Sequence, residues 1–129
     1  MKRSFNRIAN RNKGEIFYNK LSGYLPLAAK ILDIGCGDGG FLKLAKTKFS
    51  GTGIEISEYL ADFARKQNGI KVIVGDFQTE DIIHERFDGI TLVSLLEHLD
   101  DPARAIKKCF DLLNNGGVLL IKTVNYGCL

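Results

Sequence analysis

The sequence predicts an α/β fold: a doubly wound parallel sheet of about five strands, covered by helices on both faces to give three layers. Two observations predict this fold. From Lys30 onward, short apolar segments alternate with segments of helical periodicity, as in chains that cross over between parallel strands. The apolar segments are also continuous rather than alternating, which is typical of strands that are buried on both sides.

Five segments are expected to be strands, because each is short, apolar and bounded by glycine or charged residues. They are Lys30–Ile34, Gly51–Ile56, Lys71–Val74, Phe87–Ser94 and Val118–Val124. Helices are expected over Phe5–Leu21, Gly39–Phe49 and Thr79–His84, after Ser57, and from Asp101 until Asn114–Gly117 ends it. Ser57 and Asp101 are predicted caps, and Asn68-Gly69 a stop signal. Apolar side chains expected to face the core are Leu60, Ala61, Phe63, Ala64, Ala103, Ile106, Cys109, Phe110, Leu112 and Leu113.

Composition indicates one cytoplasmic domain. The chain has 129 residues, of which 45% are hydrophobic, and this argues against disorder. No apolar run approaches the roughly 20 residues of a membrane span, and no apolar signal core follows the charged start. Three widely spaced cysteines indicate neither a disulfide framework nor a zinc site.

Charge is unevenly distributed along the chain, which carries +3 in all. Residues 1–24 contain six basic side chains and a single acidic one, Glu15. We therefore expect a basic N-terminal helical segment over 1–24, followed by the main domain over 25–129. A solvated helix face is the simplest interpretation of this charge, and attraction to phosphates or acidic substrates is the alternative.

A glycine-rich loop, Gly35–Gly40, joins the first expected strand to the helix after it. Glycines allow a sharp turn and let a ligand approach the backbone closely. Alone, the loop would be only a tight strand-to-helix turn. Its position after the first strand of an α/β pattern is the context that a Rossmann-like nucleotide site requires.

Two acids end the next two expected strands. Glu55 lies about 20 residues after the loop, where Rossmann-like domains place an acid on the ribose hydroxyls. Asp76 follows the third strand at the same edge of the sheet and could accept a hydrogen bond from an exocyclic amine such as that of adenine. Phe77 beside it could pack on a purine face. Taken singly, each acid could be an ordinary strand-end or turn residue.

Together these motifs resemble those of the class I S-adenosylmethionine-dependent methyltransferases, over about residues 25–125. Ile31–Gly39 resembles the first motif of that family, Gly53–Ser57 its ribose-binding strand and Gly75–Phe77 its adenine-binding turn. Phe87–Ile90 and Leu95–Leu99 resemble the fourth-strand region of the small-molecule branch. Leu112–Leu119 resembles the segment that leads into strand five.

The resemblance implies that S-adenosyl-L-methionine is the cofactor and that its methyl group goes to a small molecule such as a lipid, quinone or sugar. It also implies roles for single residues. Asp33, Gly35 and Gly37 would hold the methionine part, with Asp33 facing the ammonium. Glu55 would hold the ribose, and Asp76 with the backbone of Phe77 would hold adenine. Ser94, Leu95 and Leu96 would line the passage of the methyl group. Cys36 and Ile56 are also expected among the cofactor-binding residues, with Cys36 as a small neutral filler of the loop rather than a nucleophile.

Several alternatives remain at this stage. A dinucleotide is the rival cofactor, but Asp33 would bring a negative charge toward its pyrophosphate. His98, beside Glu97, could act as a general base or be a polar turn residue. Some relatives hold a metal with Glu-x-x-Glu-His, but Ser94 occupies the first position here, so no metal is expected.

The end of the sequence also bears on function. In the family that this sequence resembles, the sheet continues with a C-terminal hairpin after strand five, and that hairpin is missing here. Val118–Ile121 would then form an apolar strand at an open edge, so we expect either self-association or a segment of a longer protein. Two other functions stay open: a module that only binds the cofactor, and a nucleic-acid methyltransferase guided by the basic arm, although nucleic acid is the less favoured partner.

Overall fold

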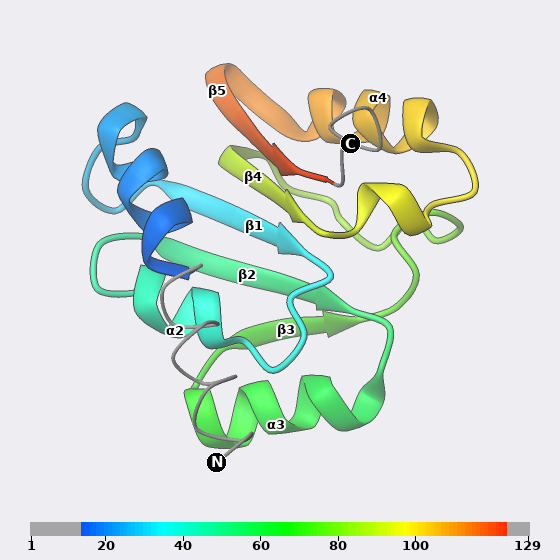
Figure 1. Ribbon diagram of the computed structural model, residues 1–129, viewed down its shortest axis with the longest axis horizontal. Coiled ribbons are helices and arrows are strands. Elements are labelled where there is room, and N and C mark those ends of the chain that lie inside the picture. The colour runs from blue at the N-terminus through cyan, green and yellow to red at the C-terminus, as the bar shows by residue number, and fades with distance from the viewer. Residues whose placement is uncertain (1–13, 124–129) are drawn as a thin grey trace, which may run out of the picture.

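A computed structural model describes residues 14–123 and contains one parallel sheet. Its strand order is β3-β2-β1-β4-β5 (Figure 1). The strands are β1 (Lys30–Ile34), β2 (Ser50–Glu55), β3 (Lys71–Val74), β4 (Phe87–Val93) and β5 (Leu113–Lys122). The predicted α/β class with a doubly wound, five-stranded sheet is confirmed.

Helices lie in the connections between these strands, except between β3 and β4. They are α2 (Gly40–Ala45), α3 (Glu58–Asn68), a short 3-10 helix η1 (Leu96–His98) and α4 (Pro102–Leu112), and a further helix covers residues 14–24. Both predicted caps are confirmed: Ser57 Oγ accepts a hydrogen bond from the Leu60 amide at 3.2 Å, and Asp101 Oδ1 accepts one from the Arg104 amide at 3.1 Å. Gly69 ends α3 in the left-handed conformation, as its stop signal predicts. The part of the expected helix Phe5–Leu21 before residue 14 lies outside the described residues.

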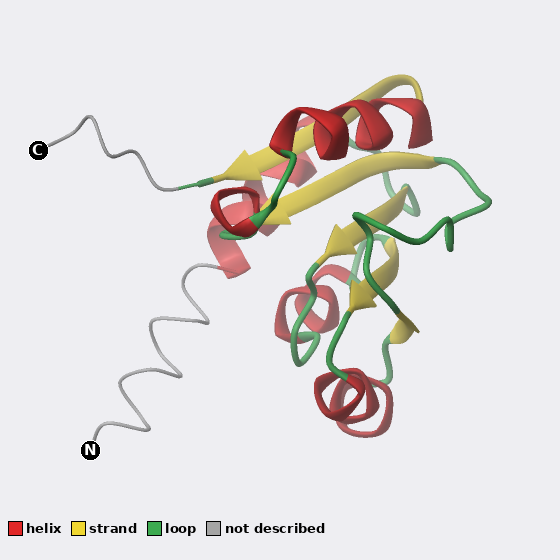
Figure 2. Ribbon diagram, turned by 90° about the vertical axis from the view of Figure 1, so that its right-hand side faces the viewer, coloured by secondary structure: helices red, strands yellow, loops and turns green. Residues whose placement is uncertain are grey.

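The sheet lies between two apolar cores, and helices lie on both sides of it (Figure 2). Helix 14–24, α2 and α3 cover one face, which we call the α2 face, and α4 with the β3–β4 connection covers the other. Side chains of β1 alternate between them: Ile31 lies in the core of the α2 face, and Leu32 and Ile34 lie in the other. Asp33 is therefore directed to the α2 face.

The chain reverses direction across the sheet between β1 and β4. It runs outward from β1 through β2 to β3, and then returns to place β4 on the other side of β1. In open α/β sheets, ligands bind at the carboxyl ends of the strands beside such a reversal. The fold therefore directs attention to the ends of β1 and β4.

Helix prediction was wrong in places. Residues 79–84 form no helix: Glu80 N donates to Asp76 O at 2.9 Å, but the turn stops there because Ile83 is drawn into the core. The side chains of Phe63 and Phe110, expected inside, are 42% and 74% exposed. Ala103, also expected inside, is exposed. In both helices, smaller residues on another side of the helix pack on the core instead. These residues are Ala61 and Ala64 in α3, and Ala105 and Cys109 in α4.

The last strand begins earlier than expected. Asn114–Gly117 was predicted to end the preceding helix, but α4 ends at Leu112 and β5 begins at once. Leu113 already pairs with Phe87, and an irregularity in register follows before Gly89 pairs with Val118. Pairing with β4 therefore overrides the local turn signal of the asparagines and glycines.

Candidate functional site

The glycine loop turns at the end of β1 through alternate left-handed residues. Gly35, Gly37 and Gly39 have φ values of 75°, 58° and 79°, which are unfavourable for residues with a Cβ atom. The amides of Gly35 and Cys36 both donate to the carbonyl of Ile54, at 2.8 and 2.9 Å. The loop is thus held against the end of β2, and its conformation depends on glycine.

Glu55 connects this loop to the end of β2. Its side chain is buried, Oε1 accepts a hydrogen bond from the Gly37 amide at 3.0 Å, and Oε2 accepts one from the Ser57 amide at 2.9 Å. Each carboxylate oxygen has a further lone pair with which to accept from a ligand. The next side chain, Ile56, is apolar and yet 68% exposed, so it offers an apolar surface beside the acid.

Asp33 is a buried carboxyl at the reversal between β1 and β4. It is 5% exposed, and Oδ1 accepts a hydrogen bond of 2.6 Å from Thr91 Oγ1 of β4. Burial raises the pKa of Asp33 to about 7, with a smaller contribution from the negative charge of Glu55 and an opposing one from Thr91. A positively charged ligand group beside Asp33 would favour its ionised form.

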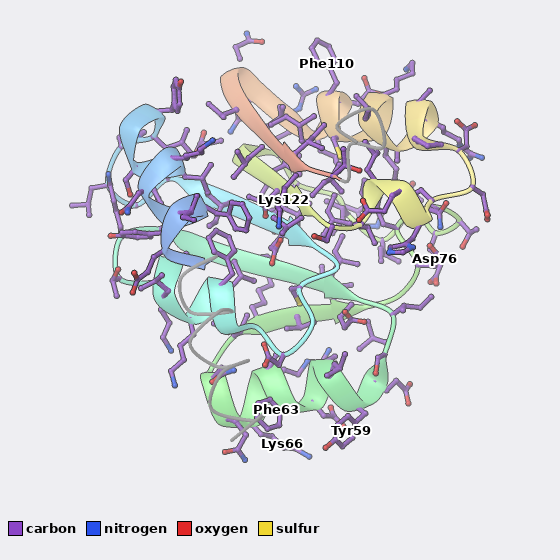
Figure 3. The ribbon with its side chains drawn as sticks, viewed as in Figure 1. Tyr59, Phe63, Lys66, Asp76, Phe110 and Lys122 are labelled. Atoms are coloured by element: carbon purple, nitrogen blue, oxygen red, sulfur yellow. The ribbon has the colours of Figure 1, made fainter. Side chains whose placement is uncertain are left out.

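Asp76 lies at the end of β3 (Figure 3). Its Oδ1 accepts a hydrogen bond from the Gln78 amide at 2.9 Å. The Phe77 ring is buried in the core below, and Lys108 Nζ lies 4.5 Å from its centre. The ring is therefore not presented to a ligand as a packing surface, and the prediction for this residue rests on its backbone.

A cavity of about 830 Å³ opens in front of the glycine loop on the α2 face. It brings together Asp33, Gly35, Cys36 and Ser94 of the predicted site, and its size suits a small-molecule site. It is lined by Gly14, Glu15, Phe17, Asp33, Gly35, Cys36, Asp38, Gly40, Phe41, Lys43, Leu44, Thr47, Val93, Ser94 and Lys122.

The remaining predicted residues lie outside that lining. Glu55, Ile56, Asp76 and Phe77 follow the same edge of the sheet toward β3. Leu95 packs on the loop instead: a Cβ atom built on Gly35 would lie 3.4 Å from its side-chain methyls. The predicted site therefore divides into a cavity at β1 and β4 and an open edge at β2 and β3.

Ser94 and Cys36 take different parts in the cavity wall. Ser94 has a φ of 53°, an uncommon conformation for a non-glycine residue that is often found at functional sites, and its amide donates to Lys122 O at 2.8 Å. The Cys36 thiol is buried, and burial, with Asp33 and Glu55 nearby, raises its pKa to about 12. Cys36 therefore stays a neutral thiol, as expected of a small filler.

His98 is exposed on η1 and does not line the cavity. Its neighbour Glu97 accepts a hydrogen bond from Thr123 Oγ1 at 2.9 Å, which ties η1 to the end of β5. A catalytic role for His98 stays a prediction. Within residues 14–123, no group of three acidic, histidine or cysteine side chains is placed to hold a metal ion.

Sequence reasoning missed two kinds of cavity residue. Phe17 lines the cavity from helix 14–24, which the sequence placed in a separate N-terminal segment. Lys122 lines it from the end of β5. A signal for Lys122 was present, because it comes directly after the apolar run Val118–Ile121, as Glu55 comes after Ile54. The sequence analysis considered only acids at the strand ends.

Comparison with known proteins shows the family to which this fold belongs. A family model described as a methyltransferase domain matches residues 6–129. This chain belongs to the class I S-adenosylmethionine-dependent methyltransferases. The ubiquinone biosynthesis O-methyltransferase of Coxiella burnetii is 40% identical over 102 residues, which cover 74% of this methyltransferase domain and 43% of the relative. The protein of the same name from Actinobacillus pleuropneumoniae is 37% identical over 108 residues, 74% of the chain and 46% of the relative. The chain thus spans less than half the length of these curated relatives.

Solved structures share the fold of this methyltransferase domain. The SAM-bound amino pentose methyltransferase CalS10 from Micromonospora echinaspora superposes with a TM-score of 0.78 and 26% identity, over 90% of this chain and 51% of that one. A TehB-like SAM-dependent methyltransferase from Corynebacterium glutamicum gives a TM-score of 0.76 over 98% of this chain and 76% of that one. At 22% identity, the second likeness shows the fold alone.

In the described part of the methyltransferase domain, no helix has both the length and the apolar character needed to cross a membrane.

Proposed function

We propose that this domain binds S-adenosylmethionine along the carboxyl ends of β1, β2 and β3 and directs its methyl group to a small-molecule acceptor. One observation carries the proposal. Asp33, Glu55 and Asp76 lie at or near the ends of three neighbouring strands, in the order β1, β2, β3. The same order is found in the cofactor, where the methionine ammonium, the ribose and the adenine amine follow one another along the molecule.

The donor and acceptor chemistry of this edge suits the cofactor. The buried Asp33 gains a counter-charge when an ammonium group binds beside it. Glu55 keeps lone pairs free on both oxygens, which suits a vicinal diol, and the exposed Ile56 offers an apolar surface next to it. Asp76 Oδ2, which does not cap the turn, suits an exocyclic amine.

When bound, S-adenosylmethionine supplies an electrophilic methyl group on a positively charged sulfur. The protein then has to position two reactants and keep water out, and such positioning alone accelerates transfer strongly. Ser94 and Leu95 stand at the end of β4, between the loop and the end of β5, where the acceptor would enter. The cavity volume of about 830 Å³ favours a small-molecule acceptor.

Glu55 provides the sharpest test of the cofactor site. Glu55→Ala should abolish detectable binding of S-adenosylmethionine in calorimetry, and Glu55→Gln should weaken it at least about tenfold, because an amide offers one acceptor oxygen in place of two. Glu58→Gln, in the first turn of α3, is the matched control and should bind as the wild type does. None of the variants should bind NAD.

Unchanged affinity in Glu55→Ala would refute the ribose assignment, and tight binding of NAD would refute the cofactor. Because Glu55 also holds the Gly37 amide, thermal unfolding of each variant is needed to show that the loop remains folded.

The alternative function is a module that binds S-adenosylmethionine without transferring its methyl group. Transfer of labelled methyl groups to a panel of phenols, amines and sugars distinguishes the two functions. Cofactor binding without any transfer would favour the binding module.

A further inference from the structure

Strand register places Lys122 on the same face of the sheet as Asp33. In register, Asp33 pairs with Thr91 of β4, Thr91 pairs with Leu120 of β5, and Val93 pairs with Lys122. Side chains two residues apart share a face, so Lys122 is directed to the α2 face, as Leu120 is. It lies two strands from Asp33, about 10 Å across the sheet, and about 7 Å closer to the carboxyl edge.

Lys122 is a half-buried cation that forms no ion pair among the residues that the structure describes. Its side chain lines the cavity at the end of β5 (Figure 3). Of the ion pairs found within residues 14–123, none involves Lys122. The pKa of Glu97 is lowered chiefly by hydrogen bonds from its own backbone amide and from Thr123, and only to a smaller extent by the charge of Lys122. Within residues 14–123, Lys122 therefore keeps its charge and its three donors available to a ligand in the cavity.

Asp33 and Lys122 lie on opposite sides of the cavity, whose lining also includes the charged residues Glu15, Asp38 and Lys43. Asp33 lies on the β1 side, with the rest of the proposed cofactor edge extending from it toward β3. Lys122 lies on the opposite side of β4, away from that edge. A cofactor that follows β1, β2 and β3 therefore leaves the β5 side of the cavity to the acceptor, with Val93 and Ser94 between the two.

We propose that Lys122 determines acceptor specificity by binding an anionic oxygen of the acceptor, either a carboxylate or an ionised hydroxyl group. This proposal rests on the proposed function, because the cofactor defines which side of the cavity is free. The substrate class is an acidic small molecule, whose negative charge faces Lys122 while its methylated atom faces the end of β4. Charge-assisted hydrogen bonds of this kind are stronger and shorter than neutral ones.

Three related probes separate charge from shape. Catechol is neutral, protocatechuate adds a carboxylate, and nitrocatechol has a ring hydroxyl that is ionised at mildly alkaline pH. Calorimetry of the whole chain, saturated with S-adenosylhomocysteine, measures the affinity of each. We expect at least one anionic probe to bind about tenfold tighter than catechol. Preference for protocatechuate assigns the partner as a carboxylate, and preference for nitrocatechol assigns it as an ionised hydroxyl.

Variants at Lys122 then test the residue itself. Lys122→Met should reduce the preference to within about twofold, and Lys122→Arg should retain most of it, since the charge remains. Lys66→Met removes the same charge from the outer side of α3, far from the cavity, and should behave as the wild type does (Figure 3). All variants should keep their affinity for S-adenosylhomocysteine, which also shows that they are folded.

Three results would overturn the proposal. A wild-type chain that binds S-adenosylhomocysteine but prefers none of the anionic probes, or binds no probe, excludes this specificity. A Lys122→Met variant that keeps the preference excludes the residue. A Lys122→Met variant that loses about tenfold in affinity for S-adenosylhomocysteine assigns Lys122 to the cofactor instead. A wild-type chain that fails to bind S-adenosylhomocysteine contradicts the proposed function itself.

Discussion

At the scale of single residues, the central feature is the Asp33 carboxyl, buried where the sheet reverses. Its pKa rises from 3.8 to about 7, chiefly because burial disfavours the charged form. Since the pKa is higher in the folded chain than in the unfolded one, the stability that this group contributes is complete below about pH 4. It is lost as the pH rises through about 7. The ligand-free protein therefore holds a destabilising charge at the site that is proposed to receive an ammonium.

Replacing this charge should separate stability from binding. Asp33→Asn keeps an acceptor for Thr91 Oγ1 and removes the buried charge. At about pH 8 we expect it to raise the free energy of unfolding by on the order of 2 kcal/mol, and below about pH 4 to have little effect. Urea unfolding at several pH values measures this difference.

The same variant should bind S-adenosylmethionine at least about tenfold more weakly at that pH, because a neutral amide does not complement the ammonium. An Asp33→Asn variant that is no more stable than the wild type at alkaline pH would contradict the raised pKa of Asp33.

At the scale of elements, the glycine loop depends on a small residue in β2. A Cβ atom on Gly53 would lie 2.4 Å from Cys36 Sγ and 3.1 Å from Leu42 Cδ1. The loop and the first turn of α2 therefore approach β2 more closely than any side chain at position 53 would allow. This contact places the loop amides, including that of Gly37, within reach of Glu55.

Gly53→Ala should disrupt this contact. Overpacking of this kind costs about 1–3 kcal/mol, and we expect a loss of that size in urea unfolding together with weaker cofactor binding. Removing the opposing side chain, in Gly53→Ala with Cys36→Gly, should relieve part of it, so the two effects should be non-additive by about 1 kcal/mol. Gly23→Ala is the control, since a Cβ atom there meets nothing within 4 Å. Full additivity would mean that the contact carries no strain.

At the scale of the whole molecule, the sheet has two unequal edges. β3 is four residues long, whereas β5 is ten residues long and, among residues 14–123, pairs only with β4. Apolar side chains of β5 are half-buried on both faces, and Phe110 of α4 is exposed nearby (Figure 3). Long apolar edge strands pair readily with other chains.

Self-association of the isolated chain therefore stays a prediction. Sedimentation over a range of concentrations tests it. Val118→Lys, on the edge strand, should reduce the association, because charged edge side chains oppose strand pairing. Phe110→Lys should leave it unchanged if the strand edge is the interface. A monomer at high concentration would contradict the prediction, and loss of association only in Phe110→Lys would place the interface on α4.

Local pattern alone predicted the framework of this domain. The bounds of β1 and β3 agree with those expected, because a buried parallel strand is a continuous apolar run between turn signals. The residues proposed to bind the cofactor could be predicted from the sequence for a related reason. Parallel strands bring their carboxyl ends to one edge, so acids that end successive strands meet there whatever the details of packing.

Properties that depend on distant partners could not be predicted in this way. Apolar spacing does not show which side of α3 or α4 packs on the sheet, so Phe63 and Phe110 were misplaced. The raised pKa of Asp33 follows from burial beneath elements remote in sequence. Lys122 reaches the cavity only because the register of β5 on β4, and of β4 on β1, turns it to the face of Asp33. The sequence shows that Lys122 ends an apolar run, but strand pairing decides that its charge faces the cavity.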